Sequence, residues 1–260
     1  MDFALIGINK SKYAVAMIKR LISFNLIPKY VIIEHNEPRS LAVSSVFIDS
    51  QKLPVPKQNL SDWAIEEEEG EFSLGAVCSQ ESIPFLTVPS HNGRQPRDII
   101  AANPIDILII TEGPIIRGPI IYMPRLCVMN IHAAPLPQYR GNWTTRFALY
   151  NDEPPIVSAH VVTPWIDEGP IIERMHYEIN LGDTLEEIDL KAMNASAELA
   201  VYSLLKIMHE GFAPNIQRIW EGKVYKGTRS DKGLEPAMPL AIQRELKARL
   251  LKGEYGFYAK

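Results

Sequence analysis

Short, continuous apolar runs separated by amphipathic stretches are the feature of this chain that most constrains its fold. Residues 107–110 read Ile-Leu-Ile-Ile, with no alternation of polar and apolar side chains. Strands of this kind are typically buried on both faces, as in a parallel sheet covered by helices. Residues 3–7 form a similar run, followed by a turn and by apolar positions spaced for a helix. Another run at 30–33 comes after that helix, so we expect the two strands to be parallel in one sheet.

Further elements of both kinds follow along the chain. A stretch with prolines and several glutamates, residues 52–75, interrupts the pattern, and we expect it to be a solvated excursion. Thr184 and Glu187 form a capping box ahead of an apolar stripe that closes at Gly211, which is the clearest helix signal. The other expected strands lie at 85–88, 105–110, 126–131, 157–163 and 171–179, with short helices at 96–102 and 117–122 and a further helix at 241–251.

This order of strands and helices predicts the α/β class, with a Rossmann-like open, twisted, mostly parallel sheet. We expect one large domain over residues 1–212 and a short C-terminal appendage over residues 213–260, where the composition becomes more basic. Of the 260 residues 46% are hydrophobic, and the formal net charge is -4. Both values are those of an ordinary globular protein.

Several other classes of protein are disfavoured. No apolar stretch reaches the roughly 18 residues of a membrane span, and the short apolar patch at the N-terminus lacks the basic region of a signal peptide. Cys78 and Cys127 are far apart and have no zinc-site spacing, which argues against a disulfide framework and against a metal site. We therefore expect a cytoplasmic protein with no metal and no membrane partner.

Three polar side chains fall at the ends of expected strands, where open α/β sheets collect their ligands. Asn130 and His132 are two residues apart, so their side chains share one face of a strand, and the next residues, Ala-Ala-Pro-Leu-Pro, turn the chain away. Asp167 precedes a Gly-Pro turn. An amide, an imidazole and a carboxylate suit acyl transfer to an amine, as oxyanion donor, general base and orienting group. The residues alone leave open that His132, like His160, is a hydrogen-bonded structural residue.

A longer pattern surrounds these residues. Residues 129–141 read Met-Asn-Ile-His-Ala-Ala-Pro-Leu-Pro-Gln-Tyr-Arg-Gly, followed by Ser-Ala-His at 158–160 and Ile-Asp-Glu-Gly-Pro-Ile-Ile at 166–172. In order and separation these segments resemble the 10-formyltetrahydrofolate-dependent formyltransferases, and most closely the sugar nucleotide N-formyltransferases. The resemblance covers about residues 1–212, which would be the catalytic domain. It implies the formyltransferase fold and an enzyme that uses 10-formyltetrahydrofolate as co-substrate, without a metal.

The resemblance also implies a role for each site residue. Asn130 would hydrogen-bond the formyl oxygen and His132 would act as general base toward the amine. Asp167 would orient and support His132, or hold a water that relays the proton. The pterin ring would lie against main-chain groups of Gly113, Pro114, Ile115 and Ile116 and of the loop 162–166, which contains Val162, Thr163 and Trp165.

The sequence departs from the family pattern at two places. A serine of the pattern is replaced by Ala134 and the leucine after it by Pro135, so any hydrogen bond from that serine hydroxyl is lost. The usual Gly-Val-Thr before His160 is Ile-Val-Ser at residues 156–158. Neither change touches Asn130, His132 or Asp167, so the reaction type is unaffected and the local geometry is in question.

The amine acceptor is less constrained than the reaction. Relatives that act on methionyl-tRNA carry a large basic C-terminal domain, whereas this chain has only residues 213–260 there and a net charge of -4, which is poor for gripping a polyanion. Relatives that act on glycinamide ribonucleotide use a Gly-Ser-rich first loop, of which residues 7–11 are a weak version. We therefore expect a small-molecule acceptor, a nucleotide-linked amino sugar, and no nucleic-acid partner. The resemblance further implies a homodimer.

Two rival interpretations belong to other classes. The same three side chains would serve a formyltetrahydrofolate hydrolase, in which water replaces the amine and formate leaves. A nucleotide-binding module without catalysis is disfavoured, because the chain has no GxGxxG and residues 70–75 lack the lysine of a phosphate-binding loop.

Overall fold

The computed structural model describes residues 1–34, 73–111, 115–226, 228–230, 233–235 and 238–258. These residues fall into two compact units, Met1–Val128 and Met129–Lys260. The expected boundary between a catalytic domain and an appendage at 212/213 stays a prediction. Most of the glutamate-rich stretch 52–75 lies outside the described residues.

The first unit contains four parallel strands, with β1 at the centre beside β2 and β4, and β3 outside β2. Leu5 of β1 lies opposite Val31 of β2, and Phe3 lies opposite Ile107 of β4. Nearly all side chains of β1, β2 and β4 are buried, which agrees with their unalternating apolar sequences. The parallel arrangement expected for the first two strands is confirmed. The strands are β1 (Phe3–Ile8), β2 (Val31–Glu34), β3 (Phe85–Val88) and β4 (Ile107–Ile110).

Helices connect these strands, and their ends carry recognisable caps. The hydroxyl of Ser11 accepts a hydrogen bond of 3.0 Å from the backbone N–H of Ala14 and so begins the first helix. Ser73 caps a second helix in the same way. That second helix was not expected, because it is short and begins inside the polar stretch 52–75. The helical elements of this unit are α1 (Lys12–Ser23), α2 (Leu74–Gln80), α3 (Arg94–Ala102) and the 3-10 helix η1 (Gly118–Tyr122).

The three longer strands β5, β7 and β8 pair in antiparallel fashion. β5 (Cys127–His132) continues from the first unit into the second, and β7 (Ile156–Val161) runs against it. β8 (Ile171–His176) runs against β7, with an irregularity in the pairing between Ala159 and His160. The chain therefore combines the parallel pairs among β1–β4 with the antiparallel pairs among β5, β7 and β8. The expected α/β class is confirmed.

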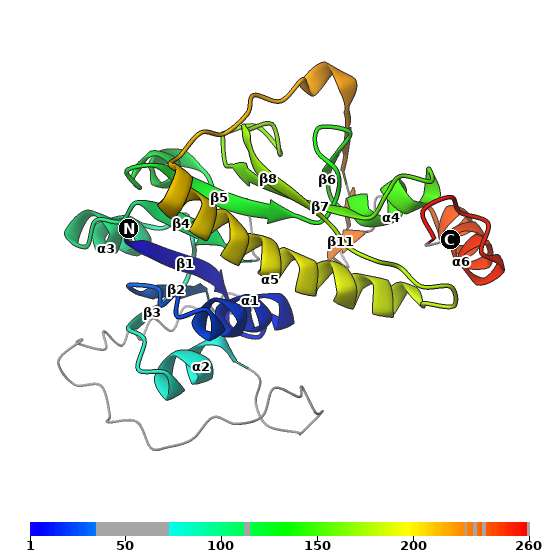
Figure 1. The fold of residues 1–260 in the computed structure, drawn as a ribbon. Helices are drawn as coiled ribbons and strands as arrows, with labels where there is room; N and C mark the ends of the chain where they lie inside the picture. The colour runs from blue at the N-terminus through cyan, green and yellow to red at the C-terminus, as the bar shows by residue number, and fades with distance from the viewer. Residues whose placement is uncertain (35–72, 112–114, 227, 231–232, 236–237, 259–260) are drawn as a thin grey trace. The chain divides into compact units, whose positions relative to one another are not determined.

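A long helix, α5 (Leu185–Glu210), packs on β7 and β8, as Figure 1 shows. It begins with the expected capping box: the Thr184 hydroxyl accepts from the backbone N–H of Glu187 at 3.2 Å, and the Glu187 carboxylate accepts from the Thr184 N–H at 2.7 Å. It ends at Gly211, whose φ of 90° lies in the region that favours glycine.

The residues beyond α5 pack against the rest of the second unit. Met238, Leu246 and Leu250 share a hydrophobic cluster with residues of α5 and of the α4 segment. β6 and β9 pair in parallel, although they are far apart in the sequence. The remaining elements are β6 (Tyr139–Gly141), α4 (Thr144–Tyr150), η2 (Ile219–Glu221), β9 (Lys223–Tyr225), the antiparallel pair β10 (Thr228–Ser230) and β11 (Gly233–Glu235), and α6 (Leu240–Lys252), which matches the helix expected at 241–251.

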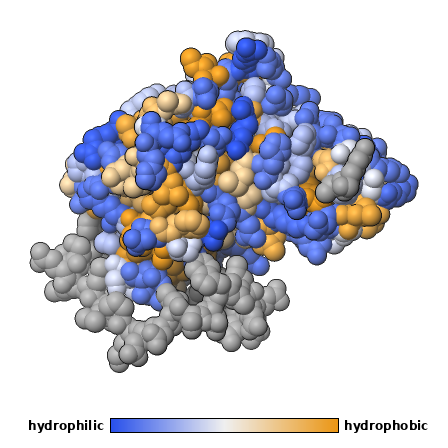
Figure 2. Space-filling view, viewed as in Figure 1, coloured by the Kyte–Doolittle hydropathy of each residue, from blue (hydrophilic) through white to orange (hydrophobic). Residues whose placement is uncertain are grey.

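The exposed surface is mixed in character. On the face seen in Figure 2, hydrophilic residues predominate and hydrophobic residues form separate smaller patches. Among the helices in the described parts of the chain, none is long and apolar enough to cross a bilayer.

Candidate active site

The ends of β5 and β7 bring three polar side chains together. Asn130 and His132 are two residues apart on β5, so their side chains point to the same face, as expected. Asn130 pairs directly with His160 of β7, and the Asn130 Nδ2 lies 3.2 Å from the His160 Nε2. His132 is 7% exposed and His160 is 2% exposed. Two imidazoles are thus held on rigid strands in a largely dry environment.

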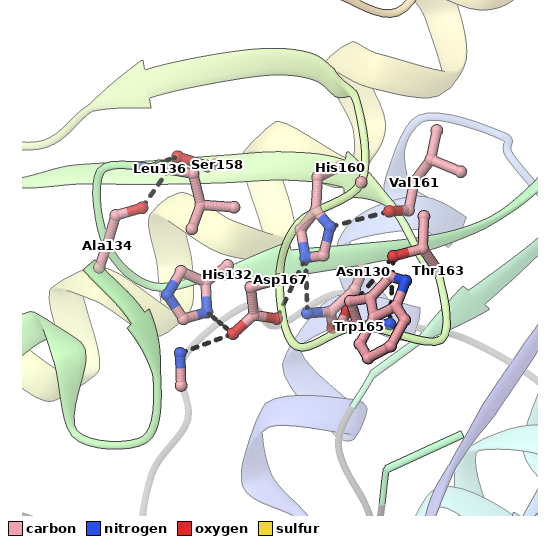
Figure 3. A network of polar contacts seen from close by, with 12 residues as sticks. Asn130, His132, Ala134, Leu136, Ser158, His160, Val161, Thr163, Trp165 and Asp167 are labelled. Carbon is pink, nitrogen blue, oxygen red and sulfur yellow. Dashed lines mark hydrogen bonds and ion pairs between the residues drawn. The ribbon is translucent and has the colours of Figure 1, made fainter. Parts of the chain in front are cut away.

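Asp167 lies between the two imidazoles, as Figure 3 shows. One carboxylate oxygen, Oδ2, is 3.6 Å from the His132 Nδ1, and the other, Oδ1, is 3.5 Å from the His160 Nε2. The backbone N–H of Gly141 donates to Oδ2 at 2.8 Å. All four polar side chains therefore belong to one network within the second unit, running from Asn130 through His160 and Asp167 to His132.

The protonation of His132 can be assigned from its neighbours. Its Nε2 lies 2.7 Å from the carbonyl oxygen of Tyr139 and 3.1 Å from the hydroxyl of Thr144. A carbonyl can only accept, so the neutral ring carries its proton on Nε2 and donates it to Tyr139. Nδ1 then presents a lone pair on the side of the Asp167 carboxylate. The negative charge of Asp167 therefore stabilises a proton bound at Nδ1.

The pKa of His132 lies below its ordinary value. Burial lowers this pKa because it disfavours the charged ring, and the neighbouring His160 lowers it further. The Asp167 carboxylate and the Tyr139 carbonyl act in the opposite direction but do not overcome burial. The imidazole is therefore neutral near pH 7 and able to accept a proton.

The pKa of Asp167 is shifted in the sense that keeps it charged. Burial alone raises the pKa of this carboxyl group, but the electrostatic influence of His132 and of His160 and the hydrogen bond from the N–H of Gly141 outweigh burial. The net result is a pKa well below the usual range of an aspartate. Asp167 is thus negatively charged beside two imidazoles near pH 7.

The orientation of Asn130 follows from that of His160. The His160 Nδ1 lies 3.0 Å from the carbonyl oxygen of Val161, so the neutral ring donates from Nδ1 and accepts at Nε2. The amide nitrogen of Asn130 supplies the N–H that Nε2 accepts. A primary amide has two N–H groups, and this bond uses one of them. The second can donate to another oxygen.

The loop after β5 is stabilised at the position where the family pattern has a serine and this chain has Ala134. The hydroxyl of Ser158, which is fully buried, donates to the carbonyl of Ala134 at 2.8 Å and accepts from the N–H of Leu136 at 3.3 Å. The loop also contains a cis peptide bond between Leu136 and Pro137. The Ser158 side chain, from β7, therefore stabilises this loop, which has an alanine in place of the serine of the family pattern.

The residues predicted to hold a pterin lie in both units. In the first, Gly113 and Pro114 are outside the described residues, Ile115 is exposed and Ile116 is buried. In the second, Val162 and Thr163 are half-buried and Trp165 is 71% exposed. The Thr163 hydroxyl bonds both the carbonyl and the N–H of Trp165, at 3.3 and 3.4 Å. Binding of a pterin by either segment stays a prediction.

Two parts of the network were not expected. The sequence leaves open that His160 is an ordinary structural histidine, and the structure shows that it contacts both Asn130 and Asp167. Thr144 was not singled out at all, and it lies at the first position of α4 with its hydroxyl against His132. Within the described ranges, no cluster of three or more His, Cys, Asp or Glu side chains could hold a metal ion.

Comparison with known proteins shows which family the segment around the polar network matches. Residues 97–204 match a family described as formyl transferase, and this segment contains the whole polar network. Among curated relatives, methionyl-tRNA formyltransferase of Thermotoga maritima is 25% identical over 134 residues, which cover 51% of this chain and 43% of the relative. The enzyme of Halorhodospira halophila is 28% identical over 167 residues, covering 63% and 53%. This chain spans only about half the length of these relatives or less.

Solved structures share the fold. An N-formyltransferase from Helicobacter canadensis, solved with folinic acid and dTDP-3-aminofucose, has a TM-score of 0.57 at 16% identity and covers 100% of this chain and 84% of its own. A sugar N-formyltransferase from Shewanella has a TM-score of 0.57 at 14% identity, covering 96% and 88%. Glycinamide ribonucleotide transformylase 1 from Symbiobacterium toebii has a TM-score of 0.56 at 18% identity, covering 84% and 93%. The resemblance to formyltransferases and the formyltransferase fold expected from the sequence are both confirmed.

Proposed function

We propose that this chain is a folate-dependent N-formyltransferase, which moves the formyl group of 10-formyltetrahydrofolate to the amine of a small acceptor. The observation that carries the proposal is the neutral, buried His132 with the Asp167 carboxylate beside its Nδ1, inside the segment that matches the formyl transferase family. Such a pair can take a proton from an attacking amine and stabilise the resulting imidazolium.

In this proposal His132 accepts the amine proton at Nδ1, because Nε2 is already used by the Tyr139 carbonyl. Asp167 does not take the proton itself, since its pKa is held well below the usual range of an aspartate. Its charge lowers the free energy of the imidazolium relative to the neutral ring. The same proton then leaves His132 for the departing folate nitrogen when the bond from the formyl carbon to that nitrogen breaks, so His132 ends neutral.

Asn130 provides the hydrogen bond to the formyl oxygen as negative charge develops there. His160 keeps the amide in place by accepting one of its two N–H groups, which leaves the other for the oxygen. A donor fixed before the reaction needs no reorganisation during it, and such donors are worth about 2.7–4 kcal/mol in other acyl-transfer enzymes. Amide and imidazole stand on the same face of β5, as one carbonyl group between them requires.

The pterin of the donor is proposed to bind the loop 162–166 of the second unit. The described residues of this loop fit the role in character. Trp165 is a large apolar side chain left in solvent at 71% exposure, and a flat heteroaromatic ring would cover such surface. The folate supplies the one-carbon group, while the chain supplies the proton acceptor and the oxyanion donor.

The proposed acceptor is a nucleotide-linked amino sugar. The structural neighbour from Helicobacter canadensis, which covers the whole of this chain, was solved with dTDP-3-aminofucose. The curated relatives are named methionyl-tRNA formyltransferases, and this chain matches about half of their length or less. Its net charge of -4 is also unfavourable for a nucleic acid. We further propose that the enzyme is cytoplasmic and forms a homodimer.

The test is tetrahydrofolate release from 10-formyltetrahydrofolate, measured with and without a panel of amines. The panel holds nucleotide-linked 3-amino and 4-amino sugars, glycinamide ribonucleotide and methionyl-tRNA. We expect release only with an amino sugar, together with a gain of one formyl group in that sugar by mass spectrometry. Release with methionyl-tRNA alone would replace the proposed acceptor while keeping the reaction.

A second candidate function, formyltetrahydrofolate hydrolysis, uses the same side chains with water as the attacking group. It predicts release of tetrahydrofolate and formate at one rate, whether or not an amine is present. Absence of release under every condition would overturn both reactions and favour a folate-binding module.

A further inference from the structure

The turn that carries Asp167 has an unfavourable backbone conformation. Asp167 has a φ of 51°, in the left-handed region, which non-glycine residues occupy infrequently and at a cost of about 1–2 kcal/mol. Surrounding contacts must therefore hold it, and without them the carboxylate would leave its place between His132 and His160. Some of the contacts that hold this turn come from the segment after α5, which the sequence suggested to be an appendage.

Gln217 supplies the central contact. Its side-chain amide nitrogen, Nε2, donates to the backbone carbonyl of Asp167 at 3.0 Å and to that of Gly169 at 2.5 Å, so one amide ties both ends of the turn. Gln217 is 5% exposed. Its chain is fixed in turn by a pair of backbone hydrogen bonds between Asn215 and Ile171, both 2.7 Å.

Arg140 holds the turn from another side. Its guanidinium pairs with the carboxylate of Glu168, the residue after Asp167, and also donates to the carbonyl of Ile219 at 3.1 Å. Arg140 is 6% exposed, so its positive charge is paired with the Glu168 carboxylate in a buried position. A Cβ atom on Gly169 would lie 1.7 Å from the carbonyl oxygen of Val161, which shows how closely the turn is packed on the end of β7.

We propose that Gln217 is a positioning residue, which keeps the Asp167 carboxylate beside His132 by holding the backbone of the turn. Residues 215–222 are thus part of the active site in function, although none of them contacts the imidazole. The inference rests on the proposed function for its catalytic meaning, but the positioning itself is a property of the folded chain and can be measured without substrate.

The charge state of His132 reports this position. The titratable groups that face His132 are Asp167, which raises the pKa of the imidazole, and His160, which lowers it; the remaining contacts are the Tyr139 carbonyl and the Thr144 hydroxyl. If the turn relaxes and Asp167 moves away, the negative charge that raises the pKa of His132 is lost. The midpoint for protonation of His132 then falls.

The experiment compares Gln217→Met and Gln217→Leu with the unchanged protein by NMR titration of the imidazole signals. Methionine keeps the length of glutamine and leucine keeps much of its volume, and neither side chain can donate a hydrogen bond. We expect both to lower the His132 midpoint by about half a pH unit or more. Gln243→Met is the matched control, because Gln243, in α6, also donates from its Nε2 to a backbone carbonyl, that of Met238. The His132 midpoint should not change in this variant.

A midpoint unchanged in a folded Gln217→Met and a folded Gln217→Leu overturns the inference, whatever the activity. In the transfer assay we expect kcat to fall about tenfold and the KM for 10-formyltetrahydrofolate to change less than about twofold. A shifted midpoint together with no turnover in the unchanged protein would reject the proposed reaction and keep the positioning role. A fall in folded fraction alone would lower kcat without moving the midpoint, and that outcome also overturns the inference.

Discussion

The His132 Nδ1 and the Asp167 Oδ2 are 3.6 Å apart, which is longer than a hydrogen bond but close enough for strong attraction between opposite charges. With its proton on Nε2, His132 has no proton to give to Asp167. The gap is therefore what a neutral imidazole beside a carboxylate should show. When His132 is charged, the two groups attract, and the distance should shorten. The site is arranged for a proton that arrives only during the reaction.

The first prediction concerns the ionisation of His132. Because burial lowers its pKa, we expect its NMR midpoint to lie below the ordinary histidine value of about 6.5. In Asp167→Asn the midpoint should fall further, because the charge that raises it is removed while burial remains. His209, in the last turn of α5, serves as an internal reference in the same spectra. A midpoint that rises in Asp167→Asn would show that the carboxylate does not act on His132.

The second prediction concerns turnover. His132→Ala and Asp167→Ala should each lose at least about two decades of kcat, the usual scale for a positioned acid-base or electrostatic group. Loss of His132 removes the proton acceptor, and loss of Asp167 removes the charge that stabilises its protonated form. His209→Ala is the matched control and should keep its rate. Near-normal rates in both site variants would remove the mechanism, provided that the unchanged protein transfers a formyl group.

The strands of the first unit were predictable because each is encoded locally. An unalternating run such as residues 107–110 has few alternatives to a strand buried on both faces, and the capping box at Thr184 marks a helix start by its own chemistry. β6 and β9 were not predictable in this way. Each has three residues, and each is a strand only because the other lies beside it. α4 begins after Trp143, whose left-handed backbone and lack of a capping side chain give no start signal.

The residues of the site also differ in how far a local sequence pattern predicts them. Asn130 and His132 could be placed on one face from their spacing alone, and the turn at Asp167 from the Gly-Pro that follows it. The contact of His160 with Asn130 depends on the antiparallel register of β5 and β7, which no local pattern contains. Gln217 lies in an irregular segment and acts on a turn far back in the sequence. Sequence patterns reveal residues that sit at element ends, whereas residues that hold them require the fold.

The third prediction concerns the hydroxyl of Ser158. Ser158→Ala leaves the N–H of Leu136 without its partner in a buried position, which should cost about 1–3 kcal/mol of unfolding free energy. Ser196→Ala is the matched control, since Ser196 is equally buried but only donates to the carbonyl of Ala192 within α5. That carbonyl keeps its helical bond, so the control should lose under about 1 kcal/mol. Urea unfolding measures both, and equal losses would contradict a special role for Ser158 in the loop.

The last prediction concerns the donor. Trp165 is 71% exposed in the loop proposed to hold the pterin, and Trp220 is 78% exposed in η2, outside that loop. If the pterin covers the indole of Trp165, truncation removes about 1–1.5 kcal/mol of aromatic contact, which corresponds to a roughly tenfold weaker affinity. Trp165→Ala should therefore raise the Kd for a stable folate such as 5-formyltetrahydrofolate about tenfold in calorimetry, and Trp220→Ala should leave it unchanged. The proposed pterin loop is wrong if Trp165→Ala binds as tightly as the unchanged chain, or if the two substitutions weaken binding equally, because only one indole can lie under the ring.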